Sequence, residues 1–520
     1  MFNFHLDREQ IGRLFTVIVF CTLSVAGFGF SIYLFLVANS PFIYIIAISF
    51  LFLSLVAGFF NVLAAYWYYK SFYYEKYLEG LKKKLRPMKS FPSVGVLIPT
   101  KDEDIGMIRR NVEALMGVSY PKNKMHIYVS NDSSHPNQRK TIKKLCGELG
   151  ATYLCRGTDK GYKAGAINYM LKHSDEEFVA IFDSDDHLVG KDFLMDIMPY
   201  FHDKGIAYVQ TEKRYAKGTF FSDSVDIFDA FFFKFIETAR AMNNTAIFSG
   251  SCGVIRRSVL DEVGGFPEYA IEDTFFSLES DLKGYHGIYL PKIYAYGAPI
   301  NTFSKLVKMQ YRYNYGDTQF IGYFFKKKGF RKKELLPTLN YMAHGFGLNY
   351  LSVVLILFTI ISTAIVFSSL PFAHIGISMI SLNNITPLVI AELLGLFAFL
   401  LSMFAPAILT KMYFKSFRKG VMVFLLNYAL AFVRAKAAIA AIIDGNKSGF
   451  KWTPTASISP ARKNDIFSAI SKTKIEVAFV VLLVVLGVLA LFKLNISGGV
   501  WLLWYGVMYS LATIFFYKYG

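Results

Sequence analysis

Residues 178–186 read FVAIFDSDD, an apolar run that passes directly into the carboxylates of Asp183, Asp185 and Asp186. A short apolar run is typical of a buried strand, and carboxylates at its end lie at the carboxyl edge of a parallel sheet, where α/β domains bind ligands. Their hard oxygen atoms suit Mg²⁺ or Mn²⁺, which in proteins also hold phosphate oxygens. An isolated acidic turn is equally consistent with a solvated loop, so the prediction of a metal site depends on its surroundings.

The surroundings follow the alternating pattern of an α/β domain. Short apolar runs at residues 94–98, 126–130, 178–182 and 206–210 alternate with polar, helix-like segments. This alternation predicts a mostly parallel sheet with helices between its strands. We place the whole domain at residues 71–340.

Polar motifs follow these strands in a fixed order. They are PTKDE at 99–103, NDSS at 131–134, GYKAGAIN at 161–168, FSGSCG at 248–253, IED at 271–273 and MQYRYNYG at 309–316. In this order and spacing they resemble glycosyltransferase family 2, specifically its membrane branch of cellulose, hyaluronan and chitin synthases, over residues 90–455. The resemblance implies a GT-A fold and inverting transfer from a nucleotide-diphosphate sugar. It further implies a UDP-sugar as donor and Mg²⁺ or Mn²⁺ as cofactor.

The resemblance also implies a role for each matching side chain. Asp273 corresponds to the catalytic base, and Asp185 to the ligand of the metal that bridges the diphosphate. The residues that correspond to the donor site are Thr100, Glu103, Asp132, Lys163, Asp183 and Arg312. Those that correspond to the acceptor site are Cys252, Gln310 and Tyr313.

Elementary chemistry agrees with these roles. A divalent cation and a guanidinium neutralise a leaving diphosphate, a carboxylate takes the proton of an acceptor hydroxyl, and an aromatic ring stacks on the apolar face of a sugar. Each residue also has a structural alternative. Asp273 would cap the following helix, Cys252 would pack in the core, and Tyr313 would fill the junction with the membrane.

Several positions depart from the pattern of the polymerising relatives. Asn131 stands where the family has an acid, and Ile271 where it has a threonine. Met309 and Tyr313 replace a glutamine and a tryptophan, and we expect the neighbouring Gln310 to substitute for that glutamine. The motifs therefore leave two acceptors for the sugar: a growing polysaccharide, or a lipid-linked molecule that receives a single sugar. A catalytically silent membrane scaffold is the alternative from another class, although the retained carboxylates argue against it.

The composition indicates a membrane protein with a soluble part. Charged residues make up 18% of the chain and hydrophobic residues 54%, whereas ordinary soluble domains have roughly 25% charged residues. Residues 14–69 contain no charged side chain and are interrupted near the middle by Asn39, Ser40 and Pro41. We therefore predict a transmembrane hairpin at residues 1–70, since each span needs about 20 apolar residues.

After the domain we expect two spans at 341–412, an interfacial helix and a gating-type loop at 413–474, and a second hairpin at 475–520. The apolar stretch 421–443 carries Arg434 and Lys436 near its middle. A central charge costs roughly 2.5–3.5 kcal/mol on insertion scales, so a helix on the membrane surface is preferred to a seventh span. The gating-type loop is assigned from FKWTPT at 450–455, which resembles the family's loop at that place.

The net charge of +18 is concentrated in runs beside the apolar stretches, such as Lys82 to Lys84 and Lys326 to Lys328. Charges so placed indicate the cytoplasmic side of a membrane and not a nucleic-acid partner. We therefore expect a multi-pass protein of the plasma membrane, in contact with the bilayer and with its catalytic domain in the cytoplasm. The four cysteines show neither metal-ligand spacing nor a disulfide framework, which is consistent with that compartment.

Overall fold

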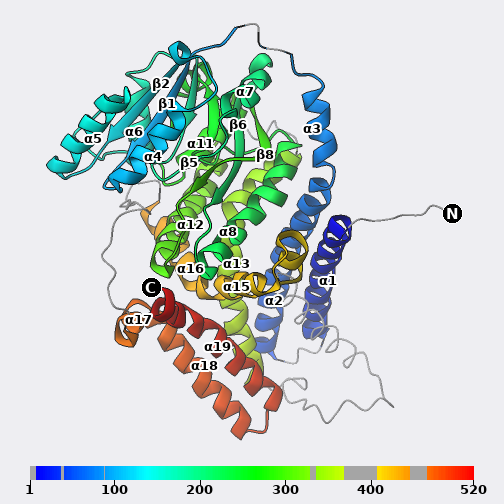
Figure 1. Cartoon of the computed structure of the whole chain (residues 1–520). Coiled ribbons are helices and arrows are strands. Elements are labelled where there is room, and N and C mark those ends of the chain that lie inside the picture. Colours follow the sequence, from blue (N-terminus) through cyan, green and yellow to red (C-terminus); the bar gives the residue numbers. More distant parts are fainter. Residues whose placement is uncertain are drawn as a thin grey trace.

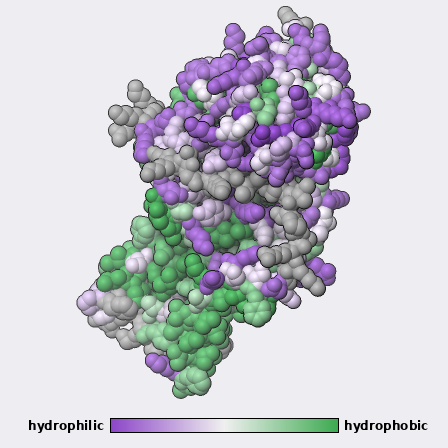
Figure 2. All heavy atoms as spheres, turned by 90° about the vertical axis from the view of Figure 1, so that its left-hand side faces the viewer, coloured by the Kyte–Doolittle hydropathy of each residue, from purple (hydrophilic) through white to green (hydrophobic). Residues whose placement is uncertain are grey.

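The computed structural model describes residues 8–36, 40–86, 88, 90–327, 335–367, 407–445 and 465–520. It has two parts, an α/β domain and a helical bundle below it (Figure 1). Figure 2 shows that hydrophilic side chains cover the α/β domain, whereas hydrophobic side chains dominate the surface of the bundle. The predicted division into a soluble part and an apolar part is therefore visible on the surface.

The α/β domain is built on one eight-stranded sheet with the order β3-β2-β1-β4-β7-β6-β8-β5. The strands are β1 Val94–Thr100, β2 Met125–Asn131, β3 Thr152–Leu154, β4 Phe178–Ile181, β5 His187–Leu188, β6 Ile206–Tyr215, β7 Gly253–Arg256 and β8 His286–Gly297. β1 pairs in parallel with β2 and β4, and β6 pairs in parallel with β8. β7 runs antiparallel to both of its neighbours, a reversal that the alternating pattern did not predict.

Helices cover both faces of this sheet. They are α3 Tyr74–Lys82, α4 Ile105–Met116, α5 Pro136–Leu149, α6 Tyr162–Leu171, α7 Phe193–Ile197, α8 Phe220–Phe231, α9 Thr238–Ala241, α10 Arg257–Val263 and α11 Glu272–Leu282, with short helices η1 Lys122–Lys124, η2 Met198–His202 and η3 Phe232–Glu237. Successive side chains of β1 point to opposite faces of the sheet. Val96 therefore lies on the face covered by α4 and α5, and Leu97 lies on the face covered by α6, α10 and α11.

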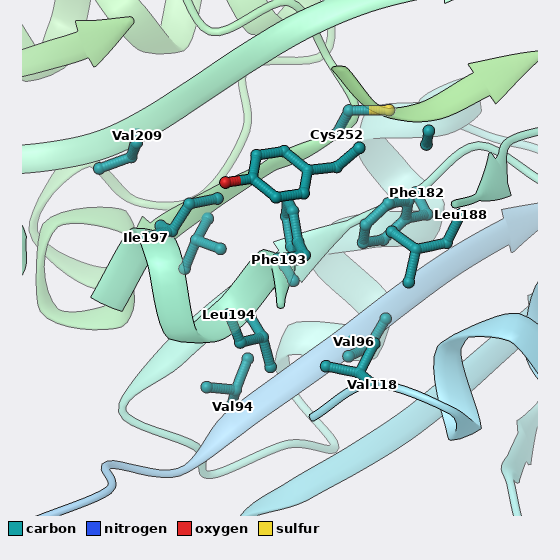
Figure 3. Packing of buried hydrophobic residues seen from close by; sticks show 14 of the residues in the cluster. Val94, Val96, Val118, Phe182, Leu188, Phe193, Leu194, Ile197, Val209 and Cys252 are labelled. Atoms are coloured by element: carbon teal, nitrogen blue, oxygen red, sulfur yellow. The ribbon is translucent and has the colours of Figure 1, made fainter. Parts of the chain in front are cut away.

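The core behind the acidic motif is a cluster of buried aliphatic side chains around Phe182 and Phe193 (Figure 3). The Phe182 ring packs edge-on against Phe193 with 5.2 Å between centroids, and both side chains are fully buried. Leu188 and Val96 complete the same cluster. Because the residue before Asp183 is anchored here, the acidic turn starts from a fixed point of the sheet.

The remaining helices within the described residues are α1 Arg8–Leu36, α2 Pro41–Ser71, α12 Phe303–Lys326, α13 Leu335–Val366, α15 Phe417–Ala429, α16 Ala431–Asp444, α17 Ile466–Lys472, α18 Lys474–Phe492 and α19 Ile496–Tyr519. Among the described residues, three helical segments are long and apolar enough to cross a membrane: 44–71, 474–492 and 498–519. The number rises to as many as five if each of two bent pairs is one span. Helix α1 contributes a shorter apolar segment at 14–29.

The bent pairs lie where the domain meets the bundle. α13 bends by 64° between residues 335–347 and 352–366, and α15 meets α16 at 42°. Arg434 of α16 is buried and donates to Gln310 of α12 and to Asn427 of α15. Two of its three nitrogens thus have amide partners, whereas Nη2 is buried without a hydrogen-bond partner among the described residues.

An α/β domain inserted in a helical bundle is confirmed. The domain limits at 71 and 340 stay a prediction, since α12 ends at Lys326 and α13 begins at Leu335. Several predicted features lie outside the described residues, namely Asn39 of the first hairpin, residues 368–406 of the two spans expected at 341–412, Lys328 of the second basic run and the gating-type loop at 450–455.

Candidate active site

A pocket of about 370 Å³ opens at the carboxyl edge of the sheet. The predicted site residues that line it are Thr100, Glu103, Asp132, Lys163, Asp183, Asp185, Arg312 and Tyr313. They come from the ends of β1, β2 and β4, from α6 and from α12. The fold therefore gathers in one cavity most of the motifs that the sequence spreads over 214 positions, from 100 to 313.

The acidic motif forms a closed turn at the end of β4. The Asp183 N–H donates to Asp186 Oδ2 at 2.8 Å, and the Asp186 N–H donates to the Asp183 carbonyl at 3.0 Å. One oxygen from each of Asp183, Asp185 and Asp186 lies within 4.8 Å of the others. Asp186 is almost fully buried behind the pocket, as expected of a structural carboxylate.

Two lysines hold Asp183 from opposite sides. Lys163 Nζ lies 2.5 Å from Oδ1, and Lys213 Nζ lies 2.7 Å from Oδ2. Burial opposes ionisation of this carboxyl, but the two ammonium groups outweigh it and hold the pKa of Asp183 well below its ordinary value. Asp183 is therefore anionic at neutral pH and fixed in place.

The pKa values of Asp185 and Glu103 are shifted in the opposite direction, upward. Burial, followed by the charges of Asp186 and Asp183, raises the pKa of Asp185 to about 6. Burial also raises the pKa of Glu103 to about 8, against a hydrogen bond from the Lys101 N–H. Crowded carboxylates of this kind are stabilised by a cation, and oxygen ligands fit a hard divalent ion. The side chains present at the turn thus fit a divalent metal.

The opposite end of the pocket is formed by β1 and β2. Thr100 Oγ1 donates to the Ser130 carbonyl at 3.0 Å, which ties the two strand ends together. Asp132 accepts from Arg156 Nε at 2.9 and 3.0 Å, so both of its oxygens already have a donor. Arg156 was not predicted, because nothing in its sequence neighbourhood marks it as a partner of Asp132.

Asp273 lies next to this pocket at the start of α11. Its Oδ1 accepts from the Thr274 N–H at 2.8 Å, and its Oδ2 lies 2.8 Å from where a Cβ on Gly250 would stand. Gly250 has a φ of +81°, and its carbonyl accepts from Lys163 Nζ at 2.9 Å. Burial raises the pKa of Asp273, although Lys163 and Arg312 oppose the shift, and a raised pKa favours proton acceptance.

Helix α12 presents one face to the pocket. Met309, Arg312 and Tyr313 line it, and Arg312 Nε is buried without a hydrogen-bond partner among the described residues. The Arg312 guanidinium lies 5.2 Å from the centre of the Tyr313 ring. Gln310 does not line the pocket, because it lies on the side of α12 that faces Arg434.

Cys252 also lies away from the pocket. It is fully buried in the hydrophobic core of Figure 3, and its thiol lies 3.5 Å from Asp186 Oδ2. Its position below the acidic turn corresponds to the structural alternative weighed above, and it supports Asp186 from behind.

Lys213 is the main residue that the sequence did not single out. It comes from β6, and it also donates to Ser251 Oγ at 2.7 Å and lies 3.8 Å from Asp186 Oδ1. In the sequence, Lys213 is only a lysine in the polar half of a long strand, and this pattern alone does not predict which residue it contacts.

Comparisons with known proteins show which families the chain is similar to. Residues 178–433 match the family model of glycosyl transferase family group 2. The chain is 31% identical over 266 residues to the cellulose synthase catalytic subunit [UDP-forming] of Xanthomonas axonopodis pv. citri, a match that covers 49% of this chain and 36% of that protein. It is 28% identical over 271 residues to the corresponding subunit of Pseudomonas fluorescens, covering 49% and 35%.

The matched part thus spans little more than a third of the length of these curated relatives. Among solved structures, a mannosyltransferase from Pyrobaculum calidifontis in complex with GDP-Man and Mn²⁺ is 20% identical and covers 74% of this chain and 96% of that one, with a TM-score of 0.48.

The predicted GT-A fold is therefore confirmed by the family match and by the mixed sheet on which the acidic turn stands. Together with the apolar helices that flank the domain, these matches identify the chain as a protein that resembles the membrane-integrated, cellulose synthase-like glycosyltransferases of family 2.

Proposed function

We propose that this protein transfers a sugar from a nucleotide-diphosphate sugar to an acceptor hydroxyl at the cytoplasmic face of the membrane, with inversion at the anomeric carbon. The main structural support for this proposal is the position of Lys163. Its Nζ is hydrogen-bonded to Asp183 and to the carbonyl of Gly250, and the carboxylate of Asp273 packs against the Cα of that glycine. Lys163 therefore connects the carboxylate expected at the sugar donor, Asp183, with the glycine beside the expected catalytic base, Asp273.

Each residue then has a chemical task. Asp185, with Asp183, would hold Mg²⁺ or Mn²⁺, which when bound neutralises charge on the diphosphate. Arg312 Nε, which has no hydrogen-bond partner among the described residues, would bind a phosphate oxygen, and Lys163 adds a second cation. Asp273 takes the acceptor proton while the bond from the anomeric carbon to the diphosphate breaks.

The nucleoside would occupy the end near Thr100 and Asp132, where Glu103 also lies. A UDP-sugar is the proposed donor, since the matched relatives are named as UDP-forming. The sugar would lie against Tyr313, whose ring faces the pocket beside Tyr215.

A panel of radiolabelled nucleotide sugars tests the proposal on the purified full chain in detergent, with and without Mg²⁺ or Mn²⁺. Cation-dependent incorporation of one sugar class into product is expected. A ladder of long products would identify a polymerase, and a single addition would identify a transferase of one sugar. Binding of donor without any turnover would contradict the proposal and favour the silent scaffold.

A further inference from the structure

Three helices meet beside Asp273: α11, in whose first turn it stands, α12 and α13. Their buried apolar side chains form one cluster, which contains Ile271, Phe275, Leu278, Phe320, Phe324 and Tyr341. A Cβ at Gly316 of α12 would lie 2.8 Å from the Ile271 side chain, so α12 passes close to the segment that leads into Asp273. Polar groups enclosed between these helices therefore surround the foot of the proposed base.

Two such polar groups come from α12 and α13. His344 Nε2 lies 3.3 Å from Thr274 Oγ1 of α11 and 3.8 Å from Asp317 Oδ1 of α12. The imidazole ring stands edge-on to Phe232 and Phe320, with 6.2 and 6.1 Å between centroids. A single ring nitrogen thus faces a hydroxyl and a carboxyl that belong to two other helices.

The contacts continue from Thr274 to the base itself. The Thr274 N–H donates to Asp273 Oδ1 at 2.8 Å, and the Thr274 side chain is almost fully buried. Asp273 Oδ2 is then left on the side of Gly250, 2.8 Å from where a Cβ on that glycine would stand. The orientation of the Asp273 carboxylate therefore depends on where Thr274 is held.

Asp317 is a largely buried acid with little to compensate a charge. Its side chain is 16% exposed, and among the described residues its carboxyl has no hydrogen-bond donor closer than the His344 imidazole. Burial raises the pKa of Asp317 well above its ordinary value, and the charge of Asp273 adds to the shift. Since two carboxyls that face each other do not both ionise easily, Asp317 keeps its proton while Asp273 is ionised.

We propose that Asp317 and His344 are positioning residues, which hold Thr274 and through it keep Asp273 in the orientation that accepts the acceptor proton. The inference rests on the transfer reaction proposed above. In that reaction the acceptor hydroxyl gives its proton to Asp273, its oxygen bonds to the anomeric carbon, and the nucleoside diphosphate leaves with the electrons of the broken bond. Because Asp317 and Thr274 face the same nitrogen of His344, the ring orients both groups and does not relay a proton between them.

The test measures kcat, the donor KM and the melting temperature of the full chain in detergent across pH, with the nucleotide sugar that the panel identifies. Wild-type kcat should fall at alkaline pH, where Asp317 ionises beside Asp273 and loses the hydrogen that it presents to His344. Asp317→Asn presents an amide hydrogen and does not titrate, so it should keep kcat at neutral pH and lose the alkaline fall. Asp317→Ala should lower kcat by about 10- to 100-fold with the donor KM unchanged, as misplacement of a catalytic group does.

Glu279→Gln is the matched control. Glu279 lies on α11, its side chain is also 16% exposed, and it pairs with Lys327 at 2.7 Å and with the Tyr323 hydroxyl at 2.6 Å, away from His344. This variant should keep the wild-type kcat and pH profile. His344→Phe fills the same space without a ring nitrogen, and it should behave like Asp317→Ala.

The outcomes separate this inference from the proposed function. An alkaline fall retained by Asp317→Asn, an equal loss of kcat in Asp317→Ala and Glu279→Gln, or a raised donor KM with kcat kept would overturn the positioning role and leave glycosyl transfer intact. Absence of donor turnover in the wild type would instead overturn the proposed function. If Asp317→Ala does not fold, the nearly isosteric Asp317→Asn still decides the point through its pH profile.

Discussion

Lys213 Nζ lies 2.7 Å from Asp183 Oδ2, although the two residues stand on strands that are separated by β7. The lysine therefore occupies an oxygen that a metal would use, and its charge repels a divalent ion. Its second contact with Asp186 keeps it in place.

Lys213→Gln should bind Mn²⁺ more tightly than the wild type, by about tenfold, because a repulsive charge about 4 Å away is removed. Titration of purified protein with Mn²⁺, followed by calorimetry, measures the change. Lys213→Arg keeps the charge and is expected to resemble the wild type. Weaker Mn²⁺ binding by the glutamine variant would show that the lysine supports the site.

Asp185→Asn should abolish cation-dependent donor turnover and leave the protein folded. The carboxylate stands in a turn whose backbone hydrogen bonds are made by Asp183 and Asp186, so the fold does not depend on its charge. Donor turnover and the melting temperature are measured together. Near wild-type turnover at ordinary Mg²⁺ or Mn²⁺ concentrations would remove Asp185 from the metal site.

Asp273→Asn should lose transfer while keeping donor binding. The amide oxygen can still accept from the Thr274 N–H, so the local structure is preserved. Removing a general base typically costs about 10²–10⁴-fold in rate. Nucleotide-sugar titration is paired with a product assay. Normal transfer would exclude the base role, and lost donor binding would indicate a role in the donor site.

Stability should depend on pH through Asp229. Burial raises its pKa from 3.8 to about 7, against a hydrogen bond from the Tyr215 hydroxyl at 3.0 Å. The folded state thus retains a proton that the unfolded state releases, so this contribution is complete below about pH 4 and is lost as pH rises to about 7. Within this window it falls by up to about 1.4 kcal/mol per pH unit.

Asp229→Asn removes that titration and keeps an acceptor for Tyr215. The variant should therefore gain thermal stability relative to the wild type as pH rises from 5 to 8. Melting curves of both proteins in one detergent across this range provide the measurement. A constant difference between the two curves would show that Asp229 does not titrate there.

The strands that end in polar motifs were predictable because apolar runs and strand-end carboxylates are local signals. The pairs Lys213–Asp183 and Arg156–Asp132 were not, since each depends on which strands become neighbours in the sheet. The antiparallel β7 belongs to the same class, because strand direction is set by the connections between strands and not by strand composition.

Gln310 shows a second reason why part of the site could not be predicted from the sequence. A shift of one residue along a helix is a rotation of about 100°, so Gln310 cannot replace Met309 on the face that α12 turns to the pocket. It bonds to Arg434 instead. A motif residue displaced by one position is thus easy to recognise in the sequence, but in the helix its side chain points to a different side.

The bond between Arg434 and Gln310 also sets an order of assembly. Gln310 is synthesised 124 residues before Arg434, and an arginine without a partner in hydrocarbon costs roughly 2.5–3.5 kcal/mol on insertion scales. The acceptor amide is therefore already in the chain when α15 and α16 are made, so the buried guanidinium finds its partner in a segment that the ribosome has already finished.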